Sequence, residues 1–207
     1  MHIFNHWLSG LILLGAVLLI AASAPSPAVS HIKLHPSSHI DIDGRSNVNR
    51  FNCGYDAHFL PAGAITVTHR QQGGVIHLQD AVLGLSVANF DCGKAPMNRD
   101  LQDMLREETY PKLYVTAKNV EIGANATDPH GSKQVTADLE ITITSITRPY
   151  TITGSVERRG DHYAFVGSLP LRLSDFHLEP PTKLFKIIKV SDDIVINLNL
   201  DFSVTEG

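Results

Sequence analysis

Several features that mark common protein classes are scarce in this sequence. Its 207 residues include two cysteines, one tryptophan, five tyrosines and eight phenylalanines, and the formal net charge is −4. Nucleic-acid binding needs a concentrated basic face, so the mild acidity disfavours a nucleic-acid partner. A membrane-spanning β-barrel carries aromatic girdles around an outward apolar band, so the small aromatic content disfavours that class as well.

Motifs of familiar catalytic and phosphate-binding sites are also absent. The sequence contains no Gly-x-Ser-x-Gly, no His-Glu-x-x-His and no glycine-rich phosphate loop. His31, His35 and His39 recur every four residues, as metal ligands on a helix would, but Pro36 disfavours a helix there. We therefore expect no metal site, no cofactor and no enzymatic activity, with a small envelope hydrolase as the alternative.

The longest apolar run, Leu8–Ala22, lies near the N-terminus. At about 15 residues it is shorter than the roughly 20 that a bilayer-spanning helix needs. Ala22-Ser23-Ala24 follows it and matches the small-x-small pattern that signal peptidases cleave. The sequence thus predicts a signal peptide over residues 1–24 and one mature domain over residues 25–207, in the periplasm or secreted. An uncleaved membrane anchor is the alternative; after cleavage we expect no membrane-spanning segment.

Both cysteines, Cys53 and Cys92, lie in the part predicted to be exported. In an oxidising compartment such a pair indicates a disulfide, and the spacing does not fit a tetrahedral metal site. Closing a loop of about 40 residues would stabilise the fold by roughly 3–4 kcal/mol in the chain-entropy model.

Alternation of apolar and polar residues dominates the chain after the apolar run, which is typical of half-buried strands. We predict early strands at 32–34, 39–43, 50–55, 65–70, 75–87 and 112–121, and longer alternating ones within 139–144, 150–157, 165–174 and 194–203. Arg148-Pro149 and Arg159-Gly160-Asp161 predict turns between the longer strands. Many antiparallel strands in series indicate an all-β barrel or sandwich.

One segment breaks the alternation and predicts an amphipathic helix over Pro96–Thr109. Asn98 is a suitable N-cap, and Met97, Leu101, Met104 and Leu105 fall on one face. The following Tyr110-Pro111 would end the helix, because a residue before proline avoids the helical region. We expect this helix to cover a barrel end or a sheet edge.

Seven segments, taken in order, resemble one known family. They are GRSNVNRFNC at 44–53, FDCG at 90–93, MNRDLQDML at 97–105, YPKL at 110–113, LEITITSITRPY at 139–150, LSDFHLEPPT at 173–182 and IKVSDDIVI at 188–196. Between Ser38 and Val204 the chain resembles YceI-like proteins, a lipocalin-like family of exported bacterial proteins associated with polyisoprenoid binding. His177 and Lys186 depart from the residues common at those positions.

The resemblance implies an extended eight-stranded antiparallel lipocalin-like barrel with one inserted amphipathic helix and a long apolar cavity. It also implies a non-covalent long-chain ligand, such as an isoprenoid quinone, a polyprenyl phosphate or another lipid, held for transport or storage. A homodimer is consistent with it. A barrel of about eight strands is wide enough to hold one small ligand. A structural interaction module with a filled core is a further alternative.

The candidate ligand-binding residues are the apolar side chains expected to point inward, together with two polar residues near the expected mouth. The inward set is Leu139, Ile141, Ile143, Ile152, Phe165, Leu169, Leu171 and Phe176; the mouth residues are His177 and Lys186. Periodicity alone favours a packed core, whereas the resemblance implies that these residues line a cavity. Gly154 and Gly167 also fall on inward faces, where they would leave room for a ligand or allow a bulge.

Overall fold

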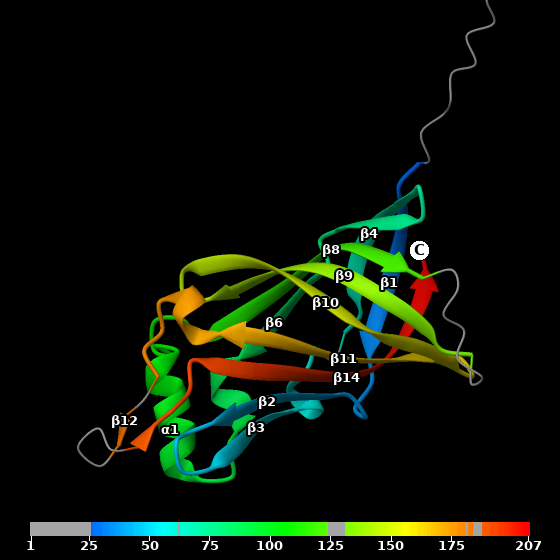
Figure 1. The fold of residues 1–207 in the computed structure, drawn as a ribbon. Helices are drawn as coiled ribbons and strands as arrows, with labels where there is room; N and C mark the ends of the chain where they lie inside the picture. Colours follow the sequence, from blue (N-terminus) through cyan, green and yellow to red (C-terminus); the bar gives the residue numbers. More distant parts are fainter. Residues whose placement is uncertain (1–25, 62, 124–130, 181, 184–187) are drawn as a thin grey trace, which may run out of the picture.

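The computed structural model describes residues 26–61, 63–123, 131–180, 182–183 and 188–207 (Figure 1). The predicted signal peptide and Lys186 lie outside these residues. The strands are β1 (Ala28–Leu34), β2 (His39–Arg45), β3 (Arg50–Asp56), β4 (Ile65–Gln72), β5 (Val75–Gln79), β6 (Val82–Ser86), β7 (Phe90–Asp91), β8 (Lys112–Ile122), β9 (Lys133–Ile143), β10 (Ile146–Arg159), β11 (His162–Arg172), β12 (Thr182–Lys183), β13 (Ile188–Lys189) and β14 (Asp193–Glu206). The helices of the described residues are α1 (Ala95–Met104) and the 3₁₀ turns η1 (Ala57–Phe59), η2 (Val87–Asn89) and η3 (Leu173–Phe176).

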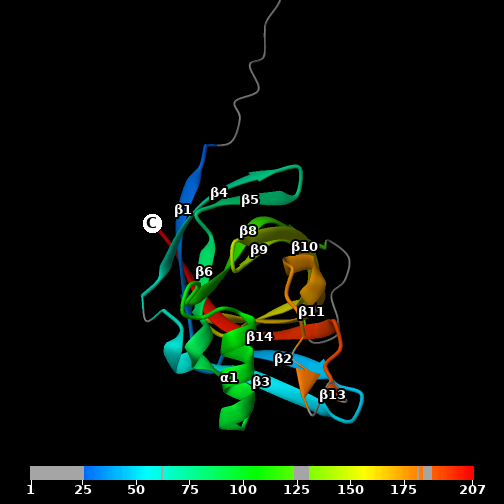
Figure 2. The ribbon, with the colours of Figure 1, turned by 90° about the vertical axis from the view of Figure 1, so that its left-hand side faces the viewer.

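Eight antiparallel strands form a closed ring. Their order is β1, β4, β5, β8, β9, β10, β11 and β14, and β14 pairs with β1 to close it. Figure 2 looks at one end of this ring, with α1 in front. The prediction of an all-β, eight-stranded antiparallel barrel with one inserted helix is therefore confirmed.

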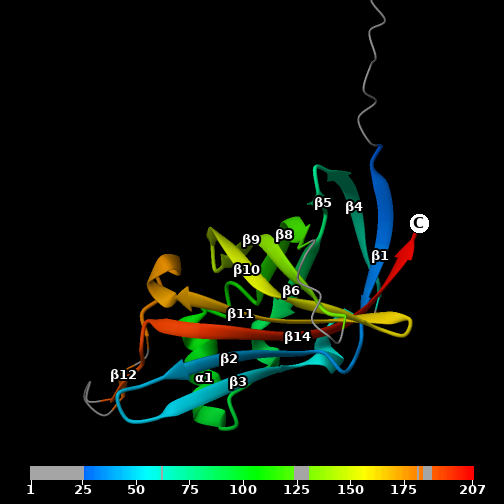
Figure 3. The same cartoon turned by 45° about the vertical axis from the view of Figure 1, so that its right-hand side comes forward.

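The two ends of the barrel are built differently because β14 changes partner along its length. Val195–Asn199 pair with β2, whereas Phe202–Glu206 pair with β1. The β2–β3–β7 branch and α1 lie at one end, here called the helix end, and β1, β4, β5 and the C-terminal residues lie at the other, here called the terminal end (Figure 3). Strand β8 is shared in the same way, between β6 and β5.

The four longer predicted strands fall on β9, β10, β11 and β14, but β9 begins at Lys133, before the predicted 139–144, and β11 ends at Arg172, where η3 follows. In β9, Val135, Ala137, Leu139, Ile141 and Ile143 are all buried, while Lys133, Gln134, Asp138 and the residues between the apolar positions are exposed or half-buried. The predicted early strands at 32–34, 39–43, 50–55, 65–70 and 112–121 fall within β1, β2, β3, β4 and β8. The predicted strand at 75–87 is two strands, because Asp80 adopts a positive φ of 63° between β5 and β6.

The turn predicted at Arg148-Pro149 was wrong. Strand β10 runs through both residues, and Pro149 pairs with Glu140 of β9. Pairing of β10 with β11 begins only at Thr153, so Pro149 lies where one side of the strand has no ladder to interrupt. A proline lacks an N–H donor and is accepted in such an edge-like position. The chain instead turns at Thr144, which has a positive φ of 56°.

The predicted helix is present but shorter and shifted. It begins at Ala95 rather than Pro96, with Lys94 as the N-cap instead of Asn98. It ends at Met104 rather than Thr109, because Arg106 adopts a left-handed φ of 53° that cannot continue an α-helix. Within the described part of the chain, no helix is long and apolar enough to cross a bilayer.

Candidate ligand-binding cavity

A cavity of about 1050 Å³ occupies the interior of the barrel. The inward side chains of the ring strands line it, and the face predicted to be apolar adds Met97, Leu101 and Met104 from α1 and Leu105 from its C-cap. Except for a few polar groups at its two ends, the lining consists of aliphatic, aromatic and sulfur-containing side chains.

The barrel interior is hollow, which alternation alone left open. Along β14, the inward residues Ile196, Leu198 and Leu200 line the cavity and are only half-buried. Val115 of β8 and Phe165 of β11 behave in the same way. In a filled core such side chains would be close-packed and inaccessible. Their partial exposure toward the inside therefore marks unfilled apolar space.

Half of the predicted binding residues line this cavity. They are Leu139, Ile141, Ile143, Ile152 and Phe165. Leu169, Leu171 and Phe176 do not line it, although they are buried in the same apolar cluster as Leu139, Ile141, Ile143 and Ile152. His177 is exposed and ends η3 in a left-handed conformation, so the structure does not place it at the cavity.

A polar brace explains why the Asp175-Phe176 segment packs in the core. The Tyr150 hydroxyl donates a hydrogen bond to Asp175 Oδ2 at 3.0 Å, and Arg172 pairs with Oδ1 of the same carboxylate at 3.0 Å. Arg148 Nε also donates to the backbone oxygen of Asp175. Burial and the neighbouring Asp175 carboxylate raise the pKa of Tyr150 to about 12. The brace holds η3 against β10 and leaves Phe176 only 1% exposed.

The inward glycines leave room for a side chain of the protein, not for a ligand. Gly154 and Gly167 face each other across β10 and β11. A Cβ on either glycine would lie 2.7 Å from ring atoms of Phe165. These two glycines therefore allow the Phe165 ring to lie flat along the barrel wall, where it lines the cavity.

The predicted disulfide between Cys53 and Cys92 is present, and both residues line the cavity. It joins β3 to the segment that enters α1. Asn98, inside the helix, reinforces this link: its Oδ1 accepts from the Cys92 backbone N–H at 2.7 Å, and its Nδ2 donates to Asp91 Oδ1 at 3.0 Å. Asn98 thus anchors the helix to the preceding strand rather than capping it.

Sequence reasoning missed a polar pair inside the cavity. Ser30 Oγ lies 2.9 Å from His69 Nε2, and both side chains line the terminal end together with Glu206. Asp100, Ser46 and Asn49 contribute polar groups near the helix end. Neither lysine nor arginine occurs among the described residues that line the cavity. A single serine and a single histidine on separate strands carry no sequence signal; only the barrel register brings them together.

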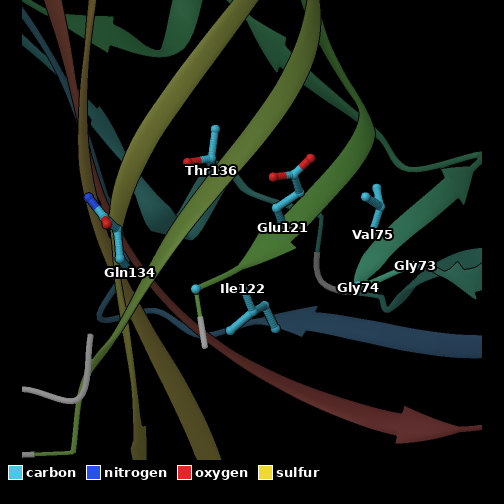
Figure 4. Close-up of a pocket in the computed structure, with 8 residues that line it drawn as sticks. Gly73, Gly74, Val75, Glu121, Ile122, Gln134 and Thr136 are labelled. Atoms are coloured by element: carbon cyan, nitrogen blue, oxygen red, sulfur yellow. The ribbon is translucent and has the colours of Figure 1, made fainter. Parts of the chain in front are cut away.

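A smaller pocket of about 300 Å³ lies at the rim, between the β4–β5 turn and the ends of β8 and β9 (Figure 4). Its polar side chains are Glu121, Gln134 and Thr136, which Figure 4 shows spread along the two strands rather than directed at one point. Catalysis needs convergent groups, and this pocket does not supply them.

Family models identify the chain. The model for the YceI-like domain matches residues 43–202, which is most of the barrel together with α1. The chain belongs to the YceI-like family. Among curated proteins, none matches it.

Two solved structures share the barrel of this YceI-like protein. BcnA of Burkholderia cenocepacia is 19% identical with a TM-score of 0.55, over 81% of this chain and 96% of BcnA. A polyisoprenoid-binding domain from Saccharophagus degradans, implicated in plant cell wall breakdown, is 11% identical with a TM-score of 0.58, over 86% of this chain and 99% of that domain. At these identities the likeness establishes the fold alone.

Proposed function

We propose that this YceI-like protein binds one long-chain apolar lipid inside its barrel, for transport or storage. The observation that carries the proposal is the apolar hollow of about 1050 Å³. Ligand sites of this kind are concave, mostly apolar and largely preformed. The polyisoprenoid-binding domain from Saccharophagus degradans has the same fold, and this supports an isoprenoid tail as the ligand.

The apolar wall is sufficient to hold such a tail without charged contacts. Burying a methylene group contributes about 0.8 kcal/mol, so a tail of about twenty carbons offers on the order of 15 kcal/mol. Association and ordering cost roughly 4–15 kcal/mol, which leaves binding favourable for a long tail and marginal for a short one. Ile141 and Leu139, which are buried in the wall and line the cavity, would contribute directly.

We further propose that the protein acts in the cell envelope by sequestration rather than by catalysis. The Cys53–Cys92 disulfide supports an oxidising compartment, in agreement with the signal peptide predicted from the sequence. The two carboxylates of the described cavity lining stand at opposite ends, with Asp100 on α1 and Glu206 on β14, while His69 lies beside Ser30 at the same end as Glu206. The rest of the lining is almost entirely apolar, which favours binding over a reaction that needs several groups acting together.

Native mass spectrometry of the purified protein tests the proposal. We expect a mass above that of the polypeptide, and organic extraction should release one equivalent of a long-chain or isoprenoid lipid. If the protein carries no lipid and takes up none from a mixture of isoprenoid quinones and fatty acids, lipid binding is refuted and a structural interaction module becomes the better description.

A further inference from the structure

The terminal end of the cavity differs chemically from the rest of its wall. On β1 the inward residues are Ser30, Ile32 and Leu34, and on β4 they end with Val67 and His69. On each strand, therefore, the inward residue nearest the terminal end is polar and the other inward residues are apolar. The last inward residue of β14, Glu206, follows the same rule.

Strand register brings these three polar residues into one corner. Ser30 stands directly opposite Glu206 on β14 and opposite Val67 on β4. His69 is two residues further along β4, at the diagonal position from which its Nε2 reaches Ser30 Oγ at 2.9 Å. Ser30 is only 6% exposed and His69 is half-buried, so this hydrogen bond is partly shielded from bulk water.

The Ser30–His69 pair retains one donor hydrogen whichever nitrogen of the ring is protonated. If the Ser30 hydroxyl donates to Nε2, the neutral ring keeps its Nδ1–H. If Nε2–H donates to Ser30, the hydroxyl proton is left. A ligand with an oxygen acceptor can use that donor. At the helix end, by contrast, Ser46 Oγ already donates to Asn49 Oδ1 at 2.8 Å.

Charge decides what kind of head group fits this corner. No lysine or arginine lines the described part of the cavity, while Glu206 stands beside Ser30 and Asp100 lies at the other end. Glu206 is exposed, so solvent weakens its repulsion of a phosphate or carboxylate head, but no lysine or arginine among the described lining residues offsets that repulsion. A quinone carbonyl or a hydroxyl carries no charge and can accept the hydrogen bond that the pair offers.

We propose that Ser30 and His69 form a hydrogen-bonding subsite for a neutral, oxygen-bearing head group, with the lipid tail directed toward α1. This rests on the proposed function and deepens it. It favours an isoprenoid quinone or alcohol over a polyprenyl phosphate. It also orients the ligand, with its polar head at the terminal end and its tail among the apolar side chains of the barrel and helix.

A competition experiment tests the subsite. The purified protein is exposed to an equimolar mixture of geranylgeranyl benzoquinone, geranylgeranyl monophosphate and the unsubstituted hydrocarbon, and native mass spectrometry measures the occupancy of each. We expect the quinone to be preferred. Ser30→Ala and His69→Leu should each reduce its preference over the hydrocarbon by roughly three- to tenfold, the worth of one net hydrogen bond. Hydrocarbon uptake should stay unchanged.

The outer face of the same two strands offers a matched control. His31 Nδ1 lies 3.1 Å from Thr66 Oγ1, a second serine/threonine–histidine type of pair that points away from the cavity. His31→Leu and Thr66→Val should leave the quinone preference intact. His69→Gln keeps an N–H donor and should retain part of the quinone preference. This variant separates loss of the hydrogen bond from a folding defect.

The outcomes separate this inference from the proposed function. Preference for the monophosphate, or a quinone preference that neither Ser30→Ala nor His69→Leu reduces, overturns the subsite while lipid binding stands. Hydrocarbon uptake without any head-group preference has the same meaning. If the wild-type protein takes up none of the three compounds, both proposals fail together.

Discussion

Removal of the Cys53–Cys92 disulfide should destabilise the barrel by an amount that the sequence separation fixes. The cross-link joins residues 39 apart. In the chain-entropy model, closing a loop of that length stabilises the folded state by about 4 kcal/mol relative to the open chain. For a domain of this size each kcal/mol corresponds to roughly 2–4 °C in Tm, so we expect Tm to fall by about 8–16 °C.

Urea denaturation of the Cys53→Ala/Cys92→Ala double variant provides the measurement, with the wild type under reducing conditions as the matched control. Both side chains are nearly buried, so alanine also removes packing contacts of sulfur. The reduced wild type keeps both sulfur atoms and loses only the cross-link. The difference in free energy of unfolding between these two samples therefore measures the lost packing of sulfur. The decrease that both samples share, relative to the oxidised wild type, measures loop closure.

Two results would refute this reasoning. If the reduced wild type unfolds within about 1 kcal/mol of the oxidised protein, the cross-link does not restrict the unfolded chain as the loop-closure model requires. If the double variant loses further stability on addition of reductant, the effect of the reductant lies outside this cysteine pair.

Three further perturbations follow from the structure. Ile141→Arg should abolish lipid retention or folding, because a charge would enter the apolar wall, whereas Thr142→Arg on the outer face should do neither; native mass spectrometry and circular dichroism decide. Ser38→Ala should lower the free energy of unfolding by about 1–3 kcal/mol, because the fully buried Ser38 hydroxyl bonds both the backbone N–H and the C=O of Asp201; urea titration measures it. The pKa of Tyr150 is raised to about 12 from an ordinary 10.0, so the contribution of its protonated hydroxyl to folding stability is fully present below pH 10 and is lost as the pH rises through 12. Tyr150→Phe should lose less stability over that interval, and equal alkaline losses in both proteins would contradict the brace.

The strands and their inward faces could be predicted where one face of a strand meets the barrel interior and the other meets water. β9 shows this most clearly, because its period of two persists without interruption from Val135 to Ile143. Local signals were less reliable where tertiary pairing overrides them. Pro149 indicated a turn, yet it lies in a strand whose outer side has no partner at that point.

The candidate site was harder to predict than the fold. Alternation identifies a side chain as inward without saying whether it meets another side chain or empty space. Leu139 and Leu171 therefore had the same pattern, and both belong to the buried core cluster, although only Leu139 of the two also lines the cavity. The Ser30–His69 contact depends on pairing between β1 and β4 across 39 residues of sequence, and nothing local to either residue indicates it.

The pairing of β1 with β14 has a consequence for how the protein assembles. These are the first and last strands of the described barrel, and Ser30 meets Glu206 across the seam. Contacts between residues so distant in sequence are the slowest to form, because a long loop must be closed first. The hairpins β9–β10 and β10–β11 join neighbouring segments and can form early. The polar corner and the enclosed hollow would thus be the last features to appear, and until that seam closes the nascent chain exposes its apolar inner wall to chaperones or to aggregation.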